Sequence, residues 1–118
     1  MANTYVNAKV DLTTTSITTL YTCAASTTGI VKSILVSEDS GNADTITLTI
    51  TSGSDVFSLF KTKAVSANNT LELLSAPLIV QAEEILKVTA ATANRLHVVA
   101  SILAVSYTHL TLPTIRSV

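Results

Sequence analysis

Hydrophobic and polar residues alternate strictly along the sequence DTITLTITS, residues 44–52. Ile46, Leu48 and Ile50 are separated from one another by single threonines. A period of two puts the aliphatic side chains on one face of a strand and the threonines on the other. Threonine also suits the pleated surface of a strand, whereas in a helix it loses side-chain freedom. The pattern predicts a strand with one buried face and one solvated face.

Eight further short runs of β-branched and aliphatic residues follow the same logic. We expect strands over Tyr5–Leu12, Ile17–Cys23, Ile30–Ser37, Val56–Lys61, Thr70–Leu74, Pro77–Val80, Ile85–Ala90 and Leu96–Leu103. The best helical rival is LIVQAEEILKV, residues 78–88. It is predicted as two strands joined by a turn at Gln81–Glu84, because β-branched and aliphatic runs flank the turn on both sides.

The segments between the expected strands have the composition of turns. EDSGNAD (Glu38–Asp44), TSGSD (Thr51–Asp55) and SANN (Ser66–Asn69) concentrate Asp, Asn, Ser and Gly, the residues that tolerate tight turns. Seven to nine short strands with this punctuation predict an all-β fold, an antiparallel β-sandwich of the immunoglobulin-like or jelly-roll-like kind. We expect one domain, residues 1–104.

The composition predicts what kind of core the fold has and which classes of partner to exclude. Of 118 residues, 47% are hydrophobic but only 4% are aromatic and none is Trp, so the core should be aliphatic. Seven basic and eight acidic residues give a formal net charge of −1, without the basic stripe typical of nucleic-acid binding. The N-terminus shows no secretion signal and no apolar run is long enough to span a bilayer. We therefore expect neither nucleic acid nor membrane as a partner, and synthesis in a cytoplasm.

The acidic turn after the third expected strand is the one candidate metal site. Glu38, Asp39, Asn42 and Asp44 offer the oxygen ligands that Ca²⁺ prefers, but their spacing matches no EF-hand loop. A hairpin turn uses the same residue types. We favour the turn and expect no metal.

No other residue forms a catalytic constellation. His97 has only His109 as a second histidine, and acid–base work needs a partner; we expect a strand-face residue, solvated or at an interface. Cys23 has no neighbouring base to lower its pKa and is predicted to be a small buried or half-buried residue at a strand end. Glu83 and Glu84 are predicted to lie in a charged turn. We expect no enzyme and no cofactor.

The threonine face of residues 45–51 is flat and uncharged, a poor defence for an exposed sheet edge. Two readings stay open: a neighbouring subunit covers this face, or it is a solvated face rich in threonine.

Residues 105–118 break the pattern of the rest of the chain. VSYTHLTLPTIRSV holds one of two Pro, one of two His and one of three Tyr, and Val105–Thr114 resembles the in-frame translation of a transposase-based sequencing adapter. Such segments are set aside before a fold is considered. We expect 105–118 to be a non-native tail, and the native chain to end within a residue or two of Ser106.

Three stretches carry a second resemblance, and together they cover most of residues 17 to 103. They are TLYTCAASTTGIVKSILVSEDSGNADTITLTI, NNTLELLSAPLIVQAEEILKVTA and NRLHVVASIL. In strand order and residue pattern these stretches resemble small β-sandwich virion proteins of tailed phages, many of them from marine and other environmental assemblies. The chain departs from that pattern at Gln81–Glu84, which lacks a turn glycine, and at Ala104, where an acidic residue is expected.

The resemblance implies a non-enzymatic structural protein of the virion. Such a protein decorates or cements the capsid, or coats tail and baseplate surfaces, through many copies that contact the major capsid protein, other virion proteins or one another. The alternative is a tail or fibre module that binds a carbohydrate or host receptor. We expect subunit contacts on the threonine face (Thr45, Thr47, Thr49) and on residues 4–12, which would extend over a neighbour. The named contacts in that segment are Tyr5, Val6 and Val10.

Overall fold

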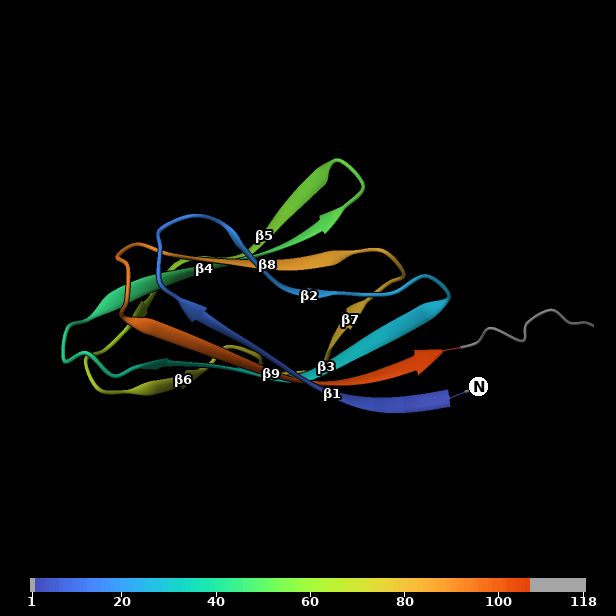
Figure 1. The fold of residues 1–118 in the computed structure, drawn as a ribbon, viewed down its shortest axis with the longest axis horizontal. Helices are drawn as coiled ribbons and strands as arrows, with labels where there is room; N and C mark the ends of the chain where they lie inside the picture. The colour runs from blue at the N-terminus through green and yellow to red at the C-terminus, as the bar shows by residue number, and fades with distance from the viewer. Residues whose placement is uncertain (1, 107–118) are drawn as a thin grey trace, which may run out of the picture.

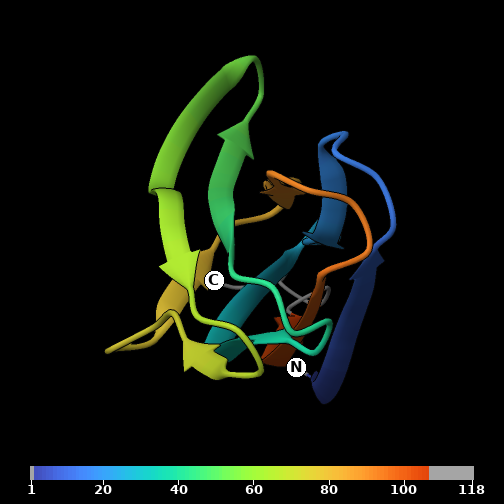
Figure 2. The same cartoon turned by 90° about the vertical axis from the view of Figure 1, so that its left-hand side faces the viewer.

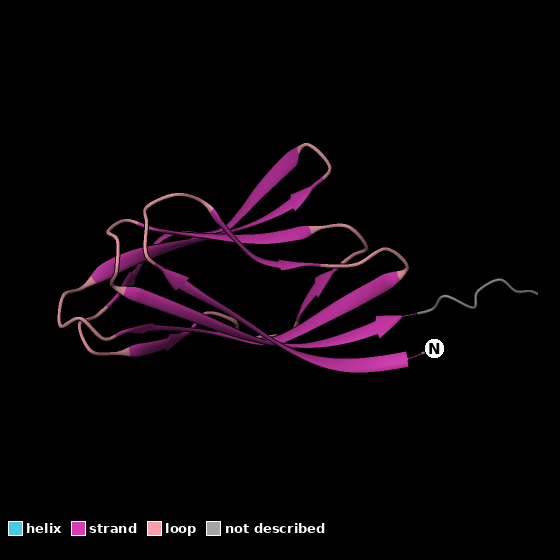
Figure 3. Cartoon of the chain, in the orientation of Figure 1, coloured by secondary structure: helices cyan, strands magenta, loops and turns pink. Residues whose placement is uncertain are grey.

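The computed structural model describes residues 2–106, which form nine strands and no helix (Figure 3). The strands are β1 (Ala2–Leu12), β2 (Thr18–Thr22), β3 (Thr27–Glu38), β4 (Asp44–Ser52), β5 (Asp55–Val65), β6 (Thr70–Glu72), β7 (Leu78–Val80), β8 (Ile85–Ala90) and β9 (Leu96–Ser106). Each expected strand is present. The clearest differences are at β5, which ends four residues later than expected, at β1 and β3, which each begin three residues earlier, and at β9, which ends three residues later.

The strands form two antiparallel sheets, as a β-sandwich requires (Figure 1). One sheet has the order β1-β9-β3-β6, with the short strand β7 also paired to β3; the other has the order β2-β8-β4-β5. Strands β6 and β7 pair with different parts of β3, one through Leu35–Ser37 and the other through Gly29–Val31. The expected all-β sandwich is therefore confirmed.

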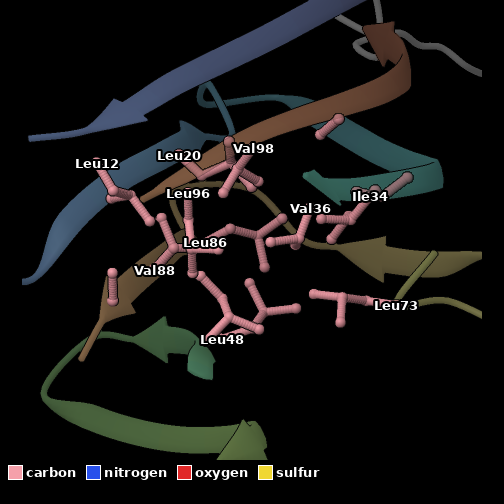
Figure 4. Packing of buried hydrophobic residues seen from close by; sticks show 14 of the residues in the cluster. Leu12, Leu20, Ile34, Val36, Leu48, Leu73, Leu86, Val88, Leu96 and Val98 are labelled. Atoms are coloured by element: carbon pink, nitrogen blue, oxygen red, sulfur yellow. The ribbon is translucent and has the colours of Figure 1, made fainter. Parts of the chain in front are cut away.

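The core between the sheets is aliphatic, as the composition predicts (Figure 4). Alternate residues of each central strand point inward, and no Phe or Tyr belongs to the fully buried cluster of the described residues. The central strands contribute Leu96, Val98, Ala100 and Ile102 from β9, Leu86, Val88 and Ala90 from β8, and Ile46 and Leu48 from β4. Period-two patterning along these strands thus directs one face of each toward the core.

The turn at Gln81–Glu84 is also confirmed, because β7 ends at Val80 and β8 begins at Ile85. Glu83 takes the left-handed backbone conformation there, with φ of 68°. The chain therefore makes the turn without the glycine that such a conformation favours.

Strand β9 continues through the first two residues of the segment expected to be non-native. Val105 and Ser106 pair with β1 on one side and with β3 on the other. The rest of that segment, including His109, lies outside the described residues.

Candidate interaction surfaces

The hairpin formed by β4 and β5 projects from the body of the sandwich (Figures 1 and 2). Its two-residue turn, Gly53–Ser54, joins Ser52 to Asp55, and Gly53 has the positive φ that such turns require. Along β5 every residue is exposed except Phe60, which is half-buried, and Val65, which is buried. This strand is the most exposed of the fold.

Large apolar side chains gather on the exposed part of β5. Val56 is 62% exposed, Phe57 54% and Leu59 36%. Burial fades along the inward face of the hairpin: Leu48 is fully buried, Ile50 is half-buried, and Phe57, which pairs with Ile50, is exposed. The opposite sheet therefore stops covering the hairpin about halfway along, and its distal half has no layer to pack against.

Two β-bulges interrupt the second half of β5. The register with β4 shifts between Ile46 and Leu48 and again between Leu48 and Thr49. At the first bulge Thr62 has φ of 49°, and its N–H donates to Oγ1 of Thr47 at 3.0 Å. The first four residues, Asp55–Ser58, keep a regular register with β4. The regular part of the edge is thus also the part that carries Val56 and Phe57.

The threonine face belongs to β4, which is not an edge strand. The expectation that this face lies at an exposed sheet edge is therefore wrong. Strand β4 is paired on both sides, with β8 and with β5. Thr45, Thr47 and Thr49 lie half-buried on the outer face of that sheet, and the Thr47 hydroxyl already accepts a hydrogen bond. The edge strands of that sheet are β2 and β5, and β5, which the sequence predicted only as a strand, is the more exposed of the two. Its run VFSLF lacks polar and apolar alternation, and that was the available signal.

The N-terminal segment forms an edge strand of the sandwich. Strand β1 pairs with β9 of its own chain along its whole length, from Ala2 opposite Ser106 to Leu12 opposite Leu96. Val6 and Val10 are half-buried and pack against the core. A β1 arm would lose this pairing and this burial.

Tyr5, by contrast, is 79% exposed and borders a hollow on the outer side of the β1-β9-β3 sheet. The hollow has a volume of about 270 Å³, near the small end of ligand sites. Lys32, at a bulge of β3 against β9, stands at its rim. The lining residues are Tyr5, Val6, Asn7, Lys32, Ser101 and Ile102. The structure thus brings together two of the predicted contact residues with an amide, a hydroxyl and an ammonium group.

The carboxylate of Glu38, in the acidic turn, binds the backbone. Its side chain is 2% exposed and accepts N–H groups of Ser40, Gly41 and Asn68 at 2.8, 3.2 and 2.9 Å, together with the Ser40 hydroxyl. Burial raises the pKa of Glu38, but these hydrogen bonds outweigh it and lower that pKa to about 2. The carboxylate therefore joins the turn after β3 to the turn after β5.

Asp44 is used in the same way, since its Oδ2 accepts the N–H of Thr92 at 3.0 Å. Within residues 2–106 no three or more His, Cys, Asp or Glu side chains are grouped as metal ligands would be. The acidic turn serves as a structural turn.

His97 lies between two aspartates that the sequence could not associate with it. Its Nδ1 is 3.4 Å from Oδ1 of Asp11 on β1, and its Nε2 is 3.2 Å from Oδ1 of Asp39 after β3. Asp11 is directly opposite His97 in the β1–β9 register. The imidazole therefore links three segments on a solvated strand face, one of the two places expected for it.

Cys23 is buried just after β2, as expected, and its thiol donates to the Thr27 carbonyl at 3.3 Å. Burial is the largest cause, and the interaction with the nearby Cys23 the second, that raises the pKa of Tyr21 to about 12. The Tyr21 hydroxyl therefore stays protonated at ordinary pH.

No segment of the described chain is a helix of the length and apolarity that crossing a bilayer would require. No protein-family model and no curated protein matches the sequence. Among solved structures, the chain is similar to a pentameric capsid protein isolated from metagenomic phage sequences, at 20% identity and a TM-score of 0.43. The similarity covers 86% of this chain and 62% of that one.

Proposed function

We propose that this chain is a non-enzymatic structural protein of a bacteriophage particle that decorates or cements the capsid surface. The proposed partners are the major capsid protein or other virion proteins, and further copies of the chain. The resemblance of residues 17–103 to small phage virion proteins supports this role. The observation that carries it is the projecting β4–β5 hairpin, whose Val56, Phe57 and Leu59 are exposed.

An exposed apolar group on a projecting element is a feature of protein–protein contact surfaces. One hairpin offers a small contact and would bind weakly alone. A particle presents many identical sites related by symmetry, so weak contacts add up when several copies are linked. A small decorating protein therefore needs no large interface.

The test is to measure the copies of this chain per purified particle of the virus that encodes it, by quantitative mass spectrometry. We expect the wild-type chain in every particle, and about tenfold fewer copies for Phe57→Ser, because hot-spot aromatics dominate small interfaces. Ile79→Ser is the matched control: Ile79 is a large apolar residue, 45% exposed, on β7 of the other sheet, and this variant should keep full occupancy. Absence of the wild-type chain from particles would contradict the proposal.

The same particles test the threonine face. Thr47→Lys with Thr49→Lys places two charges on the outer face of β4, and circular dichroism first confirms that the variant folds. Lower occupancy would assign this face to a contact, whereas unchanged occupancy would leave it solvated.

The second candidate is a carbohydrate-binding module, which the hollow beside Tyr5 favours. Sugars bind against aromatic rings with amide and hydroxyl groups at the margin, and Tyr5, Asn7 and Ser101 offer these groups. A glycan array with the wild type and Tyr5→Ala decides it: a signal that the variant loses supports this function, and a blank array removes it.

A further inference from the structure

The outer edge of β5 has no strand beside it. Strand β5 ends the order β2-β8-β4-β5, and alternate residues of such a strand direct their N–H and C=O groups away from the sheet. Within residues 2–106 the structure pairs β5 with no strand other than β4. Edges of this kind bind another strand unless they are protected. The two bulges lie in the second half of β5, and Asp55–Ser58 keep a regular register with β4.

The charges of β5 are arranged so that the strand complements itself. Asp55 lies at its beginning, Lys61 and Lys63 lie near its end, and the large apolar residues lie between the acid and the lysines. None of these three charges forms an ion pair with any other described residue. An antiparallel copy of the strand would reverse this order and place acid against base.

We propose that β5 pairs antiparallel with β5 of a second copy, about a two-fold axis at Ser58. The inference names one partner of the assembly surface proposed above and so rests on that function. A contact of this kind is isologous: the same patch serves both copies, and each cross-strand pair occurs twice.

The register is counted in positions of β4, the strand paired with β5, so that the extra residues at the bulges of β5 are not counted. Asp55 is opposite Ser52, Ser58 is opposite Thr49, and Lys63 is opposite Ile46. Ser52 and Ile46 lie three positions on either side of Thr49. A two-fold axis at Ser58 therefore places Asp55 opposite Lys63 of the second copy, on the same face of the joined sheet.

The same axis also pairs the apolar residues. Phe57 is opposite Ile50 and Phe60 is opposite Leu48, one position on either side of Thr49. Phe57 of each copy thus faces Phe60 of the other, and aromatic cross-strand pairs stabilise such contacts. An axis shifted by one β4 position in either direction would place Asp55 opposite an apolar residue of the second copy instead of a lysine. The charges therefore select the axis at Ser58.

Cross-linking tests the axis directly. Ser58→Cys would place two thiols opposite one another, where Cβ atoms lie about 4.5–5.5 Å apart, close to the spacing a disulfide needs. The control is Ser54→Cys in the adjoining turn, which the same axis would place roughly 25 Å from its counterpart. We expect the full-length Ser58→Cys protein to form an oxidised dimer at least about tenfold faster than Ser54→Cys. Native Cys23 is buried and does not compete.

Charge reversal tests the register. Asp55→Lys or Lys63→Asp alone should weaken self-association about tenfold, because each creates two like-charge contacts in the pair. The combined variant restores opposite charges and should recover it. Lys61→Asp is the matched control on the same strand, and it should not rescue Asp55→Lys. The readout is sedimentation velocity of the purified chain at up to about 1 mM, since a contact this small predicts a dissociation constant on the order of 0.1–1 mM.

Equal cross-linking rates for the two cysteine variants, or rescue by Lys61→Asp, would overturn the register. A wild-type chain that stays monomeric at about 1 mM would overturn the pairing itself. These failures are distinct from failure of the virion role, because self-association is measured on the isolated chain and occupancy on particles.

Discussion

Glu38 is a buried carboxylate that the surrounding backbone keeps ionised. Three N–H groups and a hydroxyl converge on it from two turns, and its pKa is lowered from 4.5 to about 2. Glu72 shows the same arrangement: the Ser33 hydroxyl and the N–H groups of Ile34 and Leu74 donate to its carboxylate. Burial raises the pKa of Glu72, and these hydrogen bonds lower it below its usual value. Glu38 therefore joins the two turns at the end of β3. Glu72 joins the segment after β6 to the middle of β3.

The lowered pKa of Glu38 makes stability depend on pH in one direction. A group whose pKa is lower in the folded state stabilises the fold above its unfolded pKa, and that contribution is lost as pH falls. We expect the free energy of unfolding to fall between about pH 4.5 and pH 2, measured by urea denaturation across that range.

Glu38→Gln should be less stable at pH 7, because its amide brings N–H groups against backbone donors. It should also lose stability less steeply in acid, with the remaining slope due to Glu72. An unchanged acid slope in Glu38→Gln would show that the Glu38 carboxylate does not control it.

At the scale of elements, the turn between β7 and β8 uses a strained residue. Glu83 has φ of 68°, while its N–H donates to the Cys23 carbonyl at 2.8 Å and the Cys23 N–H donates to the Glu84 carbonyl at 3.0 Å. These bonds tie the turn to the end of β2 and hold the conformation. A left-handed residue other than glycine costs about 1–2 kcal/mol.

Glu83→Gly should therefore stabilise the protein by about 0.5–1 kcal/mol, because relief of strain exceeds the added freedom of the unfolded chain. The matched control is Ala82→Gly, next to it and outside the left-handed region, which should destabilise by about 0.4–1 kcal/mol. Thermal and urea unfolding of the two variants measure the difference. Two variants that shift stability in the same direction would contradict the assignment of strain to Glu83.

At the scale of the whole molecule, the sandwich provides stability and the hairpin projects from it. Leu96, in the central strand β9, is fully buried between the sheets, whereas Leu59 on β5 is 36% exposed. The two leucines therefore test how stability is divided between these parts.

Leu96→Ala should cost about 2–5 kcal/mol, the range for a buried leucine that leaves a cavity, and Leu59→Ala should cost less than about 1 kcal/mol. Urea denaturation of both variants measures this. A comparable loss in Leu59→Ala would mean that the hairpin is part of the stability core and is not free to serve as a contact surface.

The sequence alone determined the local structure. Alternation of Thr with Ile and Leu predicted β4, aliphatic runs predicted the other strands, and clusters of Asp, Asn, Ser and Gly predicted the turns, because these signals depend on residues close together in the chain. It also predicted an aliphatic core and the structural use of Cys23. The adapter-like tail and the subunit contacts at Thr45, Thr47, Thr49, Tyr5, Val6 and Val10 remain predictions.

Only the tertiary structure decided which strands are neighbours, and hence which strand is an edge. Strand β4 has the sequence of an unprotected edge but is enclosed by β8 and β5, while β2 and β5 are the edge strands of that sheet. His97 meets Asp11 and Asp39, and Glu38 meets Asn68, through pairings between segments far apart in the chain. The physical reason is that periodicity specifies which face of a strand is buried, whereas strand order depends on how the two sheets together cover their apolar faces.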